Sequence, residues 1–169
     1  METVAGNILL IAEKPSVARD LAQAVNADRR ENGYFEGNGY TVTWAIGHLV
    51  TLPEPHQILP QWKTWSFSNL PMLPRTWPLV AVEKTRDQLE VVLQRLRHCD
   101  EIICATDAGR EGELIFRYIY EFSKCKKSVK RLWISSLTIP SIQAGMRNLR
   151  PAHEFDALAN AARARSRAD

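Results

Sequence analysis

The chain has 169 residues, of which 45% are hydrophobic and 24% are charged, a balance typical of a globular protein with one elaborated domain. No apolar run reaches the ~20 residues that a membrane helix needs, and the first residues, METVAGNILLIAEK, lack the features of a signal peptide. The net charge of +3 permits a polyanionic partner without requiring one. Three cysteines without a CxxC pair favour free thiols in a reducing, cytoplasmic compartment.

The N-terminal segments alternate between strand and helix signals. The apolar run NILLIA, residues 7–12, predicts a buried strand. Pro15 suits the first turn of a helix, and apolar residues at helical spacing extend that helix to Val25. The triplet Gly-Asn-Gly at residues 37–39 lies between two β-prone runs and predicts a hairpin.

The segment around residues 51–80 has a different composition. It holds six of the nine prolines and three of the five tryptophans. It is too apolar for a flexible linker, so we predict an ordered, irregular excursion that packs its aromatic side chains on the domain. Trp62, Trp65 and Trp77 are therefore expected to be structural, although exposed tryptophans can also stack on nucleic-acid bases.

The C-terminal half continues the alternation. Strands are predicted at residues 101–106 and 130–136, and helices at residues 84–97, 111–122 and 139–149. This order indicates an α/β domain with a mostly parallel central sheet flanked by helices. The tail, residues 155–169, is helix-prone and stops without a capping glycine or a breaker, as expected of a sequence cut from a longer polypeptide.

Acidic residues follow two of the predicted strands. Asp107 ends the second one in CATDAGREGELI, Glu111 lies in the next helical turn, and Glu13 follows the first strand in IAEKPS. Ligand sites of open parallel sheets form at the carboxyl ends of strands, so these acids converge if the two strands are neighbours. A divalent cation such as Mg²⁺, which takes oxygen ligands beside phosphate, would relieve their repulsion. The neighbouring Lys14 and Arg110 can bind phosphate, which points to phosphoryl transfer.

The same residues also fit a plainer interpretation. Glu111 and Glu113 can simply compensate the helix dipole, and Asp107 can be an ordinary N-cap. The basic run at residues 124–131 can meet phosphates, but such runs usually form solvated surfaces. His48 carries no role by this reasoning.

The motifs resemble a known family. IAEKPS and ATDAGREGELI are similar to the two signature motifs of the Toprim domain, and WAIGHL, QWKTW, LPMLP and the tail AARARSRAD resemble the topoisomerase III branch of the type IA DNA topoisomerases. The resemblance covers essentially the whole chain. It implies a Toprim, Rossmann-like domain over residues 1–155, with residues 156–169 starting a helix that leads into the next domain.

The resemblance also implies roles for the acids. Glu13 matches the general acid/base at the scissile phosphodiester, and Lys14 a neighbouring lysine on phosphate. Asp107 and Glu111 match the first and third acids of a D-x-D-x-E motif that holds Mg²⁺. The middle acid is Gly109 here, so either the metal binds more weakly through the remaining acids and water, or Glu13 or Glu113 replaces the missing ligand.

Two arginines complete the implied catalytic set. Arg110 matches the arginine within the D-x-D-x-E motif, and Arg165 an arginine near the active site. Asp169 is either the carboxylate partner of Arg165 or half of a surface ion pair four residues apart on a helix, worth ~0.3–0.5 kcal/mol.

The family implies an enzyme that uses Mg²⁺ to cut, pass and reseal one DNA strand through a tyrosine in a later domain. None of the tyrosines of this chain matches that motif, so we predict packing roles for Tyr34, Tyr40, Tyr118 and Tyr120 and no relaxation of DNA by this chain alone. Single-stranded DNA and the remaining domains of the same polypeptide are the expected partners, and the oligomeric state stays open. The alternatives are a self-contained Toprim metal nuclease and a non-catalytic nucleic-acid-binding module disabled by Gly109.

Overall fold

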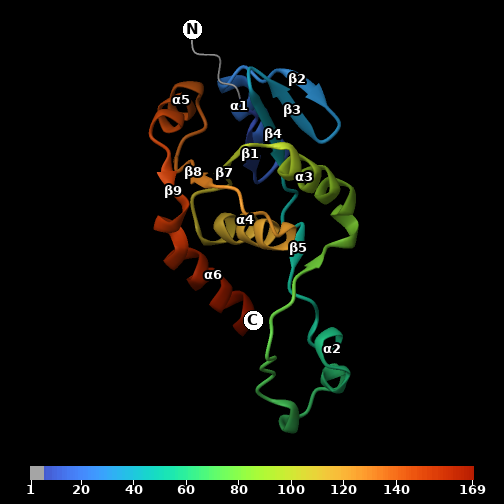
Figure 1. Ribbon diagram of the computed structural model, residues 1–169. Coiled ribbons are helices and arrows are strands. Elements are labelled where there is room, and N and C mark those ends of the chain that lie inside the picture. Colours follow the sequence, from blue (N-terminus) through green and yellow to red (C-terminus); the bar gives the residue numbers. More distant parts are fainter. Residues whose placement is uncertain (1–5) are drawn as a thin grey trace.

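The computed structural model describes residues 6–169 and contains a central sheet of seven strands with helices on both faces (Figure 1). The strand order is β2-β3-β4-β1-β7-β8-β9. The four middle strands are parallel, namely β4 (Tyr40–Trp44), β1 (Ile8–Ala12), β7 (Glu101–Ala105) and β8 (Val129–Arg131). The edge strands are antiparallel, namely β2 (Arg29–Glu31), β3 (Tyr34–Gly37) and β9 (Arg150–Pro151). The predicted α/β class is therefore confirmed, while the expectations for residues 1–5 lie outside the described residues.

Two hydrophobic cores lie on opposite faces of the sheet. Successive residues of β1 alternate between them: Leu9 and Ile11 enter one core, and Leu10 and Ala12 the other. Helices α1 (Pro15–Ala24) and α5 (Ile139–Arg147) cover the second face. The first face carries α3 (Arg86–His98) and α4 (Arg110–Ser123), with α6 (Asp156–Ala168) packed on α4.

Local sequence signals explain several boundaries. Pro15 occupies the first turn of α1, and the Thr138 hydroxyl caps α5 by accepting a hydrogen bond from the Ser141 N–H. The β3–β4 hairpin turns at Asn38 and Gly39, both with positive φ (52° and 79°), as predicted.

The strand predicted at residues 130–136 is wrong in length. Strand β8 ends at Arg131, after which Trp133 turns to stack on Phe155 with ring centroids 4.8 Å apart. The Leu132 N–H still donates to the Cys104 carbonyl of β7, but residues 132–136 have no strand structure.

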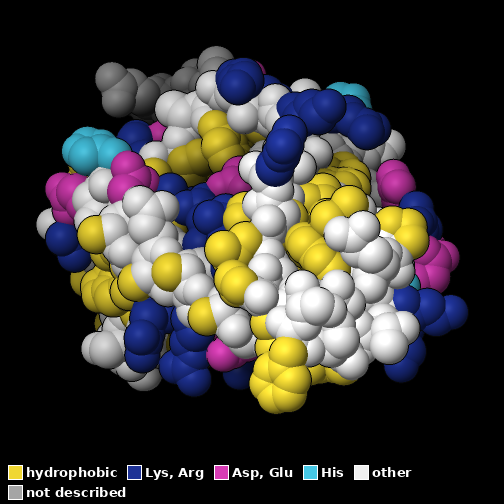
Figure 2. Space-filling model, turned by 90° about the horizontal axis from the view of Figure 1, so that it is seen from below, with side chains coloured by type: hydrophobic (Ala, Val, Ile, Leu, Met, Phe, Trp, Pro, Cys, Tyr) yellow, Lys and Arg dark blue, Asp and Glu magenta, His cyan; other side chains and the backbone are white. Residues whose placement is uncertain are grey.

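The Pro/Trp-rich excursion is ordered and extends away from the sheet (Figure 1). Strands β5 (Val50–Thr51) and β6 (Val80–Ala81) pair at its base, and between them lie α2 (Pro55–Ile58) and two short 3₁₀ turns. Trp62 is buried, but the predicted packing of Trp65 is wrong, since 78% of that residue is exposed. Figure 2 shows the molecule from below the view of Figure 1, and on the face turned to the viewer hydrophobic side chains lie among groups of Lys and Arg side chains.

The C-terminal helix packs on the body of the domain. Ala159 and Ala162 of α6 are buried, and the Asp156 carboxylate accepts a hydrogen bond of 2.8 Å from Arg117 of α4. The domain boundary at residue 155 stays a prediction. Among residues 6–169, no helix has the length and apolarity that would let it cross a membrane.

Candidate active site

Glu13 and Asp107 meet where two parallel strands end. Strands β1 and β7 are direct neighbours with Ala12 opposite Ala105, so the residues that follow them emerge at the same edge of the sheet. The Asp107 N–H donates a hydrogen bond of 3.0 Å to the Glu13 carboxylate. Burial, and then the negative charge of Asp107, raise the pKa of Glu13 above its ordinary value of 4.5. The structure thus crowds two of the three carboxylates that the sequence predicted to converge.

Glu111 lies in a neighbouring cavity of about 580 Å³. Its carboxylate oxygen is 2.5 Å from Nε2 of His48, and because a carboxylate only accepts, Nε2 carries the proton. Arg110 and Arg165 line the same cavity, so the predicted catalytic arginines come together. The histidine was missed by sequence reasoning, because its contact joins residues 63 positions apart.

Of the three predicted metal ligands, Glu13 and Asp107 lie together, whereas Glu111 lies apart from them on His48. No three acidic, histidine or cysteine side chains of residues 6–169 are close enough to form a metal cluster. Glu13 and Asp107 offer adjacent oxygen ligands, whereas the Glu111 carboxylate is held by His48. The pair fits Mg²⁺, which often binds through one or two carboxylates and keeps several waters.

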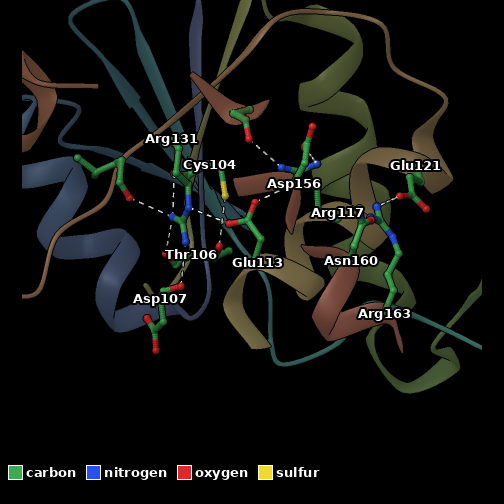
Figure 3. Close-up of polar contacts among 12 residues, drawn as sticks. Cys104, Thr106, Asp107, Glu113, Arg117, Glu121, Arg131, Asp156, Asn160 and Arg163 are labelled. Atoms are coloured by element: carbon green, nitrogen blue, oxygen red, sulfur yellow. Dashed lines mark hydrogen bonds and ion pairs between the residues drawn. The ribbon is translucent and has the colours of Figure 1, made fainter. Parts of the chain in front are cut away.

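A buried arginine fixes the end of β7 (Figure 3). Arg131 is 0% exposed, and its Nε donates to a carboxylate oxygen of Glu113 at 3.0 Å. Its other two nitrogens donate to backbone carbonyls around the acid loop, those of Cys104, Thr106, Asp107 and Leu132. In the close-up, the Asp107 carboxylate points away from this guanidinium. The arginine therefore positions the loop through its backbone and leaves the Asp107 side chain free to act.

This network corrects two expectations. Glu113 is 1% exposed, and its second oxygen accepts a 3.0 Å hydrogen bond from Arg117, so both oxygens are engaged and it is not available as the replacement metal ligand. Arg131 belongs to the core and not to a solvated basic surface. The sequence signal was weak: one arginine at the inward-facing end of a short strand, next to the apolar run LWI.

The two glycines of AGREG, Gly109 and Gly112, have different surroundings, and only one of the two positions requires glycine. A Cβ at Gly112 would lie 2.2 Å from the Asp107 carbonyl oxygen, so only glycine lets α4 approach the acid loop this closely. Gly109 precedes α4 with extended backbone, and a Cβ there would meet nothing within 4 Å. Close backbone approach therefore requires glycine at position 112 but not at position 109. Because Gly109 itself precedes the first turn of α4, Asp107 is not its N-cap.

The remaining candidates lie at the edges of the site. Lys14 is exposed just before α1 and follows Glu13 in the chain. Its positive charge lowers the pKa of Glu13, but this effect is smaller than the raising effect of burial. Nε of Arg165 is 3.9 Å from the Asp169 carboxylate, with both side chains largely exposed, which is the geometry of a weak surface pair.

The tyrosines have the packing environments that the sequence predicted. Tyr40 packs against a core, and Arg95 covers the ring of Tyr34. The Tyr120 hydroxyl donates to a backbone carbonyl, and that of Tyr118 donates to Ser166.

Comparison with known proteins identifies the family of the chain. The Toprim domain family matches residues 8–137. DNA topoisomerase 3 from Shouchella clausii is 48% identical and that from Bacillus cereus 49% identical, each over 95% of this chain. The chain spans 22% of the length of these curated relatives. The structure of full-length topoisomerase I from Thermotoga maritima shares the fold, with a TM-score of 0.55 at 19% identity over 85% of this chain and 21% of that chain. The family match covers most of the described residues and both acidic motifs, and the chain therefore belongs to the Toprim domain family.

Proposed function

We propose that this chain is the N-terminal Toprim portion of a DNA topoisomerase III and supplies the acid and cation half of its DNA-cleavage site. The single observation that carries the proposal is the contact between the Asp107 N–H and the Glu13 carboxylate at the ends of β1 and β7. It brings together one acid from each of the two motifs, Glu13 and Asp107. The identity to the topoisomerase 3 relatives supports the same assignment.

The proposed chemistry divides between protons and charge. Glu13, whose pKa is raised, exchanges a proton with an oxygen of the scissile phosphodiester. Asp107 would hold Mg²⁺ together with Glu13 in its ionised form, and Glu111 would be a third carboxylate for the ion. The ion would neutralise charge that develops on the phosphate. Lys14, together with Arg110 and Arg165, binds the phosphate oxygens.

The proposed fragment lacks a nucleophile. The tyrosine that would form the covalent link to DNA belongs to a later domain of the full-length enzyme. Cutting, strand passage and resealing of one strand therefore require the rest of the polypeptide, and this chain alone binds single-stranded DNA without relaxing it. We place the enzyme in the cytoplasm, which agrees with the free thiols of all three cysteines.

The test uses end-labelled single-stranded DNA incubated with the chain, with and without Mg²⁺. Products are denatured and separated before and after protease treatment. We expect no cut and no covalent adduct, together with Mg²⁺ binding by calorimetry that weakens in Glu13→Gln. Metal-dependent cutting without an adduct, lost in Glu111→Gln, would identify a self-contained nuclease instead. Absence of metal binding would favour the non-catalytic module.

A further inference from the structure

The excursion presents aromatic side chains to solvent on a segment whose only carboxylate is Glu54, near its start. Phe67 is 96% and Trp65 78% exposed, although large aromatic side chains are usually buried. Residues 55–82 contain no aspartate or glutamate, and they carry the exposed cations Lys63 and Arg75. An exposed aromatic surface with cations beside it suits a polyanion whose flat groups can stack.

The excursion is tied to the candidate site at its base. The Arg167 guanidinium of α6 lies 5.2 Å from the centre of the Trp77 ring. Two residues earlier on the same helix, Arg165 lines the cavity that also holds Arg110. Positive side chains and aromatic rings thus follow one another from the phosphate-binding side of the site toward the excursion, whose base lies near the C-terminal end of α6 in Figure 1.

We propose that the excursion is a second contact for single-stranded DNA, in which Trp65 and Phe67 stack on bases and Lys63 and Arg75 bind the backbone phosphates. This inference rests on the proposed function, because the DNA strand bound at the cleavage site would continue onto the excursion. The chief competing occupant is a protein domain, which would use the exposed leucines of the excursion as well. Base stacking is favoured because the most exposed large side chain is aromatic and residues 55–82 lack carboxylates.

The experiment measures binding of a fluorescein-labelled 15-nucleotide oligo(dT) to the 169-residue chain by anisotropy, in EDTA and at several salt concentrations. We expect Trp65→Ala and Phe67→Ala each to weaken binding roughly 5- to 100-fold, while Trp65→Phe keeps most of the affinity because it keeps a stacking ring. Lys63→Ala should lower the slope of log affinity against log salt by about 0.7.

Leu73→Ala is the matched control, because Leu73 is 71% exposed on the same segment but cannot stack. Unchanged affinity in this variant, with losses in the aromatic variants, supports the inference. Equal loss in Leu73→Ala and Trp65→Ala, without salt dependence, would identify an apolar docking surface and overturn it. Wild-type affinity in both aromatic variants, with loss in Arg110→Ala, would also overturn it while leaving the proposed function intact. No binding by the wild-type chain would reject both.

Discussion

Replacing Arg131 with methionine tests whether the buried guanidinium holds the acid loop in place. The change leaves Glu113 inside the core with one partner, Arg117, and removes a donor from four carbonyls. Breaking a buried pair on one side costs about 3–5 kcal/mol. A domain has a total stability of about 5–15 kcal/mol, so the variant should remain folded but lose a large part of its unfolding free energy. Urea denaturation followed by circular dichroism measures that loss, and the expected fall in Tm is about 6–20 °C.

Lys130→Met is the matched control on the same strand. Lys130 pairs with Glu101 at 2.6 Å, but 51% of its side chain is exposed, so the loss should stay below about 1 kcal/mol. In Arg131→Met with Glu113→Leu, no charge is stranded, and the double variant should be more stable than the sum of the two single losses predicts. Equal losses in Arg131→Met and Lys130→Met, or additive single losses, would refute the reasoning.

Further predictions concern the acid motifs. Gly112→Ala should destabilise the protein by about 1–3 kcal/mol in urea denaturation, since its Cβ would collide with the Asp107 backbone, and a wild-type midpoint would contradict this steric argument. Gly109→Asp should fold normally and bind Mg²⁺ more tightly in calorimetry, because the position is open and gains a ligand; unchanged affinity would place the metal elsewhere. In EDTA, the unfolding free energy of the wild type should fall as pH rises through the raised pKa of Glu13, because the folded protein favours the protonated carboxyl. Glu13→Gln should remove this fall. The variant should therefore be more stable than wild type at pH 7 but not at pH 4. Identical pH profiles would contradict it.

The sequence alone was sufficient to predict the class of fold and the meeting of Glu13 with Asp107. Strand and helix periods depend on neighbouring residues, so β1, α1, β7 and α4 were predictable from local patterns. Because parallel strands share one carboxyl edge, the meeting of Glu13 with Asp107 followed once the two strands were neighbours.

Tertiary structure decided what local patterns do not contain. The burial of Arg131, the engagement of both Glu113 oxygens and the contact of His48 with Glu111 depend on residues distant in sequence. The exposure of Trp65 likewise depends on how far the excursion extends from the core. A charged or aromatic residue has the same local signal whether it is buried, paired or solvated, because its environment is set by the packing of whole elements. The sequence therefore identified Glu13 and Asp107 as groups that meet at the end of the sheet, and the three-dimensional packing determined that Glu111 and Glu113 are held by other residues.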